Sequence, residues 1–139
     1  MVQIFQFQSP SMITVSNCQS AGLQKSAHSF EELLKLRSSN VLRDSFVLVS
    51  PENSPTKTLT AGYTTIYPGC RTSGHGHAEF EEIYYITKGA GMMKVGDEEF
   101  PVKAGDCFMV PAGLFHATMN PNLEVLEYFW VISANQAKP

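Results

Sequence analysis

The stretch Gly69–Gly89, GCRTSGHGHAEFEEIYYITKG, decides the fold of this chain. Two histidines, His75 and His77, stand one residue apart between glycines, and three glutamates follow them inside an aromatic run. Successive side chains of a strand point to opposite faces, so both imidazoles are expected on one face. There they can bind a single metal ion at about 2.0–2.1 Å each. The carboxylates available to complete such a site are Glu79, Glu81 and Glu82.

A second stretch, residues 105–120 with the sequence GDCFMVPAGLFHATMN, carries one more histidine. It reads as a strand, a Pro-x-Gly turn and then His116. A histidine after a turn is more often a structural residue than a ligand, and a His-x-His pair by itself is a weak metal signal. Neither stretch alone decides between a metal site and ordinary packing.

Together, the two stretches resemble the two motifs of the cupin superfamily. The first motif is Gly, five residues, His-x-His, three or four residues, Glu, six residues, Gly. This chain matches it at Gly69, His75, His77, Glu82 and Gly89. The second motif is Gly, five residues, Pro-x-Gly, two residues, His, three residues, Asn. This chain matches it at Gly105, Pro111, Gly113, His116 and Asn120.

The resemblance, which covers residues 57–132, implies an all-β fold, namely a double-stranded β-helix or jelly-roll barrel. It also implies a homodimer and one bound divalent metal ion. The ligands carried over to this chain are His75, His77, Glu82 and His116. Glu79 and Glu81 are then expected at the rim or in solvent. Ligand type alone does not choose among Fe, Mn, Ni, Zn and Cu.

The pattern of strands supports the same fold class. From Phe46 onward, short β-branched and aromatic runs alternate with turn residues, which is typical of an antiparallel sandwich or barrel. Tight turns are expected at Val95–Glu98 and Lys103–Asp106. The strands are expected near residues 45–50, 57–67, 83–88, 90–95, 98–102, 106–110, 115–119 and 124–132.

The predicted organisation is an N-terminal extension, residues 1–45, followed by a barrel domain, residues 46–139. The extension is expected to contain a strand at 2–8 and a short helix over Ser29–Arg37, with Ser29 as its N-cap. The apolar segment Ile4–Phe7 is expected to pair with a partner barrel in a homodimer, because single small barrels leave strand edges that natural proteins cover.

Composition excludes several classes of function. The 139 residues fit one globular domain, with 43% hydrophobic and 17% charged residues. The net charge is −3 and no basic block occurs, so neither nucleic acid nor a membrane is an expected partner. The start, MVQIFQFQSP, lacks the features of a secretory signal, and three scattered cysteines suit neither a disulfide framework nor a thiolate zinc site. We expect a cytoplasmic protein with reduced thiols.

Tyr84 shares the expected strand face of Glu82, so it should point into the barrel beside the ion. The charge of the ion would lower the pKa of this phenol and allow it to act as a general base. A core tyrosine bonded to backbone is the alternative. Tyr85 faces the opposite way. Weaker candidates for the pocket are Met92, Phe108, Trp130 and, for a substrate carboxylate, Arg71.

Three functions from different classes fit such a site. The first is a metal-dependent lyase or isomerase that removes a proton from a small oxygenated substrate, with Tyr84 as the base. The second is an Fe or Cu dioxygenase, and the third is a module that binds a sugar or metal without catalysis. Gly74–Met93 resembles cupin-type phosphoglucose isomerases, and Glu82–Tyr84 resembles small cupin dimethylsulfoniopropionate lyases. The complete ligand set beside Tyr84 motivates the first function.

Overall fold

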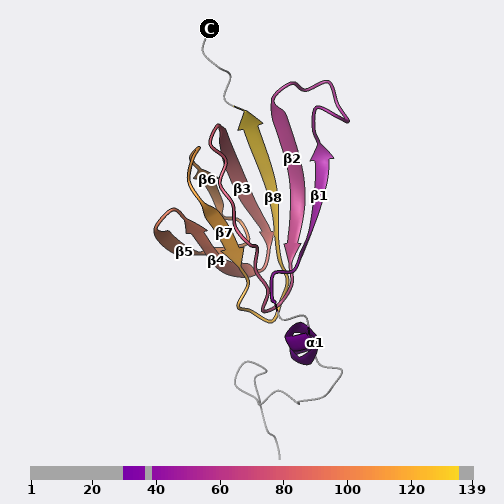
Figure 1. Cartoon of the computed structure of the whole chain (residues 1–139), viewed down its shortest axis with the longest axis vertical. Coiled ribbons are helices and arrows are strands. Elements are labelled where there is room, and N and C mark those ends of the chain that lie inside the picture. Colours follow the sequence, from indigo (N-terminus) through magenta and orange to yellow (C-terminus); the bar gives the residue numbers. More distant parts are fainter. Residues whose placement is uncertain (1–29, 37–38, 135–139) are drawn as a thin grey trace, which may run out of the picture.

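The computed structural model describes residues 30–36 and 39–134 of the chain (Figure 1). Its elements are α1 Phe30–Leu36, β1 Arg43–Val49, β2 Leu59–Ile66, β3 Phe80–Lys88, β4 Ala90–Val95, β5 Glu98–Lys103, β6 Cys107–Val110, β7 His116–Met119 and β8 Leu126–Ala134. Each strand overlaps a predicted one, and the predicted all-β class is confirmed. The strand expected at 2–8, the N-cap at Ser29 and the pairing segment Ile4–Phe7 lie outside the described residues.

The strands form two antiparallel sheets around one core. The larger sheet has the order β1-β2-β8-β3-β6, and the smaller has the order β5-β4-β7. The last strand, β8, therefore lies between β2 and β3, which are neighbours in the sequence (Figure 1). Such long-range pairing is the double-stranded β-helix arrangement of a jelly roll. Fully buried side chains from both sheets are Ile66, Ile86, Met93, Val110 and Leu126.

β3 shows how a strand with period two serves both packing and chemistry. Its alternate residues Glu82, Tyr84 and Ile86 are buried. The residues between them, Ile83 and Tyr85, are exposed on the outer face. Because every second side chain of a strand points to one face, Ile86 packs in the core while Glu82 and Tyr84 place polar groups in the barrel interior.

The two predicted tight turns are present. β4 and β5 are joined by the two residues 96–97, and Val95 pairs with Glu98 across them. At the next turn, the Asp106 N–H donates to the Lys103 carbonyl oxygen at 3.0 Å, and the Lys103 N–H donates to the Asp106 carboxylate at 2.8 Å. Turn residues thus fixed these connections locally, as the sequence indicated.

β1 lies at an edge of the larger sheet and pairs with β2 from Arg43 opposite Ile66 to Val49 opposite Ala61. The predicted domain boundary between residues 45 and 46 falls inside this strand. All seven residues of β1 are exposed, including the consecutive apolar residues at 46–49.

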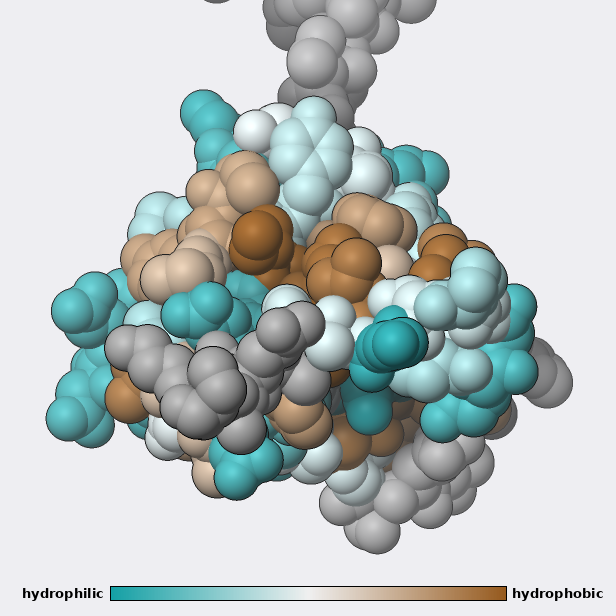
Figure 2. Space-filling model, turned by 90° about the horizontal axis from the view of Figure 1, so that it is seen from above, coloured by the Kyte–Doolittle hydropathy of each residue, from teal (hydrophilic) through white to brown (hydrophobic). Residues whose placement is uncertain are grey.

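Figure 2 looks onto the end of the barrel at which β1 and β8 finish and β2 and β3 begin. Hydrophobic side chains gather in the middle of this face, with polar ones around them. Exposed hydrophobic residues near these strand ends are Leu48, Val49, Leu59 and Phe80. Among the described residues, no helix is long and apolar enough to cross a membrane.

Candidate metal centre

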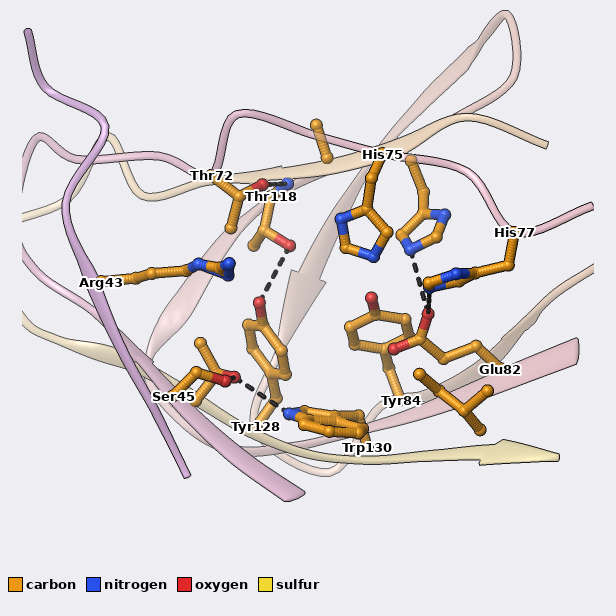
Figure 3. A pocket seen from close by; sticks show the side chains of 14 residues that line it. Arg43, Ser45, Thr72, His75, His77, Glu82, Tyr84, Thr118, Tyr128 and Trp130 are labelled. Atoms are coloured by element: carbon orange, nitrogen blue, oxygen red, sulfur yellow. Dashed lines mark hydrogen bonds and ion pairs between the residues drawn. The ribbon is translucent and has the colours of Figure 1, made fainter. Parts of the chain in front are cut away.

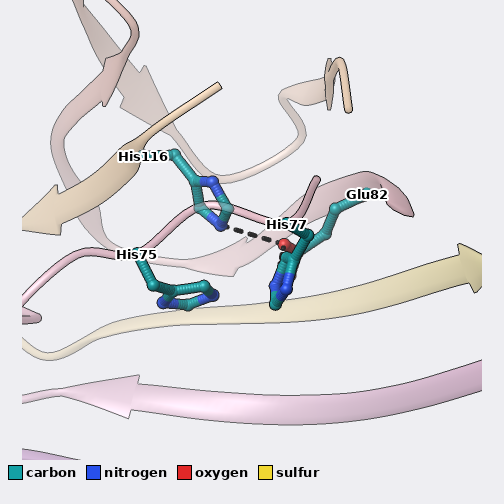
Figure 4. Close-up of side chains that lie close together, drawn as sticks. All are labelled: His75, His77, Glu82 and His116. Atoms are coloured by element: carbon teal, nitrogen blue, oxygen red, sulfur yellow. Dashed lines mark ion pairs between the residues drawn. The ribbon is translucent and has the colours of Figure 1, made fainter. Parts of the chain in front are cut away.

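Four side chains from separate parts of the chain meet in the barrel interior (Figure 4). They are His75, His77, Glu82 and His116. One donor atom from each residue lies within 4.8 Å of the other three donors. Ligands at about 2.0–2.2 Å from one ion stand about 3–4 Å apart, so small adjustments would let all four bind the same ion. The structure brings together the four residues that the sequence predicted as metal ligands.

A pair of backbone hydrogen bonds holds His75 against His116. Each residue donates its N–H to the carbonyl oxygen of the other, at 3.0 and 2.8 Å. His75 and His77 lie between β2 and β3, in a segment that meets β7 in an isolated bridge at His75. The two imidazoles lie together as expected, with centroids 4.6 Å apart.

Glu82 and His116 supply the buried half of the site. Their side chains are 4% and 2% exposed. The Glu82 Oε2 atom lies 3.0 Å from His116 Nε2 and 3.7 Å from His77 Nε2. The other ring nitrogen of His116, Nδ1, lies 3.2 Å from the Leu114 carbonyl oxygen, which can only accept a hydrogen bond. A neutral His116 therefore carries its proton on Nδ1 and leaves Nε2 free to bind a metal.

Three buried atoms at the centre have no hydrogen-bond partner among the described residues. They are His77 Nε2, Glu82 Oε2 and His116 Nε2. With the Nδ1 tautomer of His116, its Nε2 and the Glu82 oxygen are both acceptors and share no hydrogen. An unsatisfied buried polar atom costs about 1–3 kcal/mol, so a missing partner is indicated. A divalent ion would accept all these lone pairs at once, and three neutral imidazoles with one carboxylate suit such an ion.

A proton is the competitor of a metal at these ligands. Burial lowers the pKa of His116, but the Glu82 carboxylate and the Leu114 carbonyl oxygen raise it more, so the net shift is upward. Burial lowers the pKa of His75, and repulsion from His116 and His77 lowers it further. A proton therefore competes more strongly at His116 than at His75.

A cavity of about 150 Å³ adjoins the four side chains (Figure 3). A cavity of this volume can hold a molecule of the size of benzene. Hydrogen-bonded hydroxyl groups line its far part. Ser45 Oγ and Thr64 Oγ1 lie 2.7 Å apart, and Trp130 Nε1 donates to Thr64 Oγ1 at 3.0 Å. Thr118 Oγ1 donates to the Tyr128 hydroxyl at 3.4 Å.

Tyr84 lies between the metal centre and the core. Its ring stacks on Phe108 with centroids 5.1 Å apart and meets His116 edge to face at 6.0 Å. Its hydroxyl points into the cavity toward the histidines (Figure 3). Burial raises the pKa of Tyr84 far above its usual value, and the negative charge of Glu82 raises it further. The lowered pKa expected from the sequence would have to come from the charge of an ion, because the protein groups act in the opposite direction.

Of the other residues predicted to line the pocket, some do and some do not. Trp130 lines the cavity, whereas Phe108 packs behind Tyr84. Met92 lies elsewhere on the surface, along β4. Arg71 does not line the cavity: it is exposed, and its Nε donates to Asn40 Oδ1 at 3.1 Å.

Among the described residues, the arginine that lines the cavity is Arg43, which lies in the predicted N-terminal extension, residues 1–45. The sequence does contain one indication of this role: Arg43 and Ser45 are two residues apart, and residues two apart on a strand share a face. That signal is usable only once the pairing of β1 with β2 is known, and this pairing joins residues about 20 positions apart.

Comparisons with known proteins agree with this geometry. A family model described as "Cupin domain" matches residues 62–132. The chain is 32% identical to the "Oxalate-binding protein" of Thermotoga maritima over 85 residues, which are 61% of this chain and 70% of that protein. It is 29% identical to "Protein SchB" of Streptomyces halstedii over 73 residues, 52% of this chain and 53% of that protein.

Solved structures show the same fold. The structure of a predicted oxalate decarboxylase from Thermotoga maritima matches with a TM-score of 0.61 and 29% identity, over 66% of this chain and 80% of that one. Among relatives matched by sequence alone, an uncharacterized protein of Methanocaldococcus jannaschii is 42% identical over 52 residues, which are 37% of this chain and 42% of that protein. The chain thus spans between 42% and 70% of the length of these curated relatives.

Proposed function

The chain is a member of the cupin family, and from that premise we propose that it is a metal-dependent enzyme of the lyase or isomerase type. Its substrate is a small oxygenated metabolite with a carboxylate, keto or sugar-like group, from which a proton is removed. This proposal is carried by three buried ligand atoms that have no hydrogen-bond partner in the described part of the chain and that lie at the wall of a cavity that Tyr84 also lines.

A divalent ion held by this ligand set would draw electrons from a bound carbonyl or carboxylate oxygen and so acidify the neighbouring C–H bond. His75 is exposed whereas His116 and Glu82 are buried, so the solvent side of the site is left for substrate. The cavity favours a small substrate, because its volume is about 150 Å³.

Tyr84 Oη is the proposed proton acceptor. Its ring is fixed by stacking on Phe108, and its hydroxyl faces the cavity. Since burial and Glu82 raise its pKa, the phenol stays protonated in the protein alone. A nearby positive ion would counter both effects, so Tyr84 is proposed to act as a base only when metal is bound.

The relatives support a carboxylate as the bound group. One relative is named an oxalate-binding protein and another is described as a predicted oxalate decarboxylase, and oxalate is a small dicarboxylate. Both names describe those proteins and not this chain. The two names make carboxylic acids the first compounds to test on this chain.

Proton exchange in deuterated water tests the proposal. Protein loaded separately with Fe²⁺, Mn²⁺, Ni²⁺, Zn²⁺ or Cu²⁺ is incubated with small hydroxy acids, keto acids and sugars, and loss of the C–H signal is followed by NMR. We expect exchange that needs the ion, proceeds equally without oxygen, and falls at least about a hundredfold in Tyr84→Phe. Tyr85→Phe is the matched control, because Tyr85 is on the outer face of the same strand and should leave the rate unchanged.

Two outcomes would overturn this function. Turnover that stops without oxygen would identify a dioxygenase instead. Binding of these compounds to the loaded protein with neither exchange nor turnover would identify a binding module.

A further inference from the structure

Arg43 is an exposed cation that lines the cavity and that the proposed chemistry does not yet use. It begins β1 and lies outside residues 62–132, where the family model matches. Figure 3 shows its side chain reaching into the cavity from the side opposite His77 and Glu82.

Strand register shows that Arg43 and the metal ligands enter from opposite ends. Arg43 pairs with Ile66, which pairs with Leu126 of β8. Glu82 pairs with Ile132 of the same strand. These positions on β8 are six residues apart, which corresponds to about 20 Å of strand, yet both side chains line the same cavity. A ligand between them would meet the metal ligands at one end and a guanidinium at the other.

The Arg43 guanidinium makes no hydrogen bond or ion pair with the described part of the chain. Of the residues that line the cavity and are described, Glu82 alone is acidic, and it belongs to the metal centre. The hydroxyl-bearing residues that line the cavity with Arg43 are neutral: Ser45 on its own strand, and Thr64, Thr72, Thr118 and Tyr128. An arginine with hydroxyl neighbours and no acidic partner is suited to a carboxylate, which its fork of N–H groups can bind at two points.

The charge of Arg43 also reaches the interior. Burial raises the pKa of Tyr128, while a hydrogen bond from Thr118 and the positive charge of Arg43 act against that rise. Together with an ion bearing a net site charge of about +1, the cavity would carry two positive centres and attract a doubly charged anion.

We propose that Arg43 binds a carboxylate at the end of the substrate remote from the metal, so that the substrate class is a small dianionic acid. This inference rests on the proposed function, because the ion binds the other end of the same molecule. It is distinct from that function, because it concerns a charge that proton abstraction does not require.

The test compares dicarboxylates with their monoamides, which have the same size and one charge less. The probes are malonate, succinate and glutarate with malonamate, succinamate and glutaramate. Calorimetry gives their dissociation constants for zinc-loaded protein, since zinc is inert to oxygen. We expect at least one dicarboxylate to bind about tenfold more tightly than its monoamide to the unaltered protein, and Arg43→Gln to abolish that preference. Arg43→Lys should keep an intermediate preference, because an ammonium retains the charge but not the two-point contact.

Arg71→Gln is the matched control. It removes the same charge from an exposed arginine that does not line the cavity, so the preference should remain. Zinc content is measured for each variant and should be equal in all, since neither arginine is a ligand.

The results separate the two proposals. If the protein takes up zinc but shows no preference for a dicarboxylate, or if the preference survives Arg43→Gln or is lost in Arg71→Gln, the role of Arg43 is wrong and the metal centre stands. If the unaltered protein takes up no zinc or other divalent ion, the proposed function fails, and the Arg43 inference fails with it.

Discussion

Glu81 and Glu82 are adjacent in the sequence, yet their carboxylates meet different environments. Glu82 is 4% exposed and lies 3.0 Å from His116 Nε2, whereas Glu81 is exposed on the other face of β3. One residue of strand is enough for this difference, because neighbouring side chains point to opposite faces. At the residue scale, the pair offers an internal control for the metal centre.

Glu82→Gln and His77→Ala should each reduce zinc affinity by about a hundredfold or more, since a lost ligand costs at least as much as a lost supporting contact. Glu81→Gln should leave the affinity unchanged. Competition with a chelator measures the affinity. Circular dichroism checks that the barrel stays folded, as expected because the hydrophobic core does not include the metal ligands. Full metal occupancy in His77→Ala would show that the ligand assignment is wrong.

Acid should weaken metal binding through His116. Burial lowers the pKa of His116, but Glu82 and the Leu114 carbonyl oxygen raise it more, so the net pKa lies above the usual histidine value of about 6.5. A raised pKa means that the ion must displace a more tightly held proton. Zinc affinity, and activity with it, should therefore fall steeply as the pH drops from about 7 to 5.

Titrations of metal-free protein with zinc across this pH range measure the effect. The acid limb should move to lower pH when the metal concentration is raised a hundredfold, because metal and protons compete for one site. A limb that does not move would assign the pH dependence to another group.

At the scale of elements, the sequence correctly predicted the features that depend on neighbouring residues alone. The hairpin at Val95–Glu98, the turn at Lys103–Asp106 and the inward face of β3 all follow from period and turn residues, and all are present. The role of Arg43 could not be read this way, because it depends on which strand β1 pairs with. Pairing between distant strands is set by the packing of the whole core, and a local sequence pattern does not contain that information.

The segment with His75 and His77 lies outside the predicted strands and outside the observed ones. The alternation of side chains that is typical of a strand nevertheless predicted that its two imidazoles lie together. A ladder needs a partner over several residues, and here the structure has an isolated bridge from His75 to His116.

Two motif glycines test the turns that connect the strands. Gly89 and Gly105 both have positive φ, at +77° and +94°. A Cβ at Gly89 would lie 2.2 Å from the Val125 carbonyl oxygen, whereas one at Gly105 would meet nothing within 4 Å. Gly105→Ala should therefore lower the free energy of unfolding by about 1 kcal/mol through backbone strain alone. Gly89→Ala should cost about 1–3 kcal/mol more, because a backbone oxygen must move.

Urea unfolding of the two variants measures the difference, and Gly105→Ala serves as the control for left-handed strain. Equal losses in the two variants would contradict the close approach of Val125 to Gly89.

At the scale of the whole molecule, the edge of the larger sheet is open along β1. Phe46 and Leu48 are 58% and 52% exposed, and β1 has a paired neighbour on one side, β2. An exposed edge strand with large apolar side chains invites pairing with another chain. The homodimer that the sequence predicted through Ile4–Phe7, a segment outside the described residues, can be tested on this edge as well.

We expect the unaltered protein to have a dimer mass in light scattering at micromolar concentration. The double variant Phe46→Asp with Leu48→Asp should have a monomer mass, because the new charges would be buried unpaired in the interface. Met109→Asp is the control: Met109 is 53% exposed on β6, at the opposite edge of the same sheet, and its change should leave the mass unaltered. Thermal unfolding of each variant checks that the barrel is intact. A monomer mass for the unaltered protein would refute the dimer. A dimer that persists in the double variant would place the interface away from β1, and loss of the dimer in Met109→Asp would move it to the β6 edge.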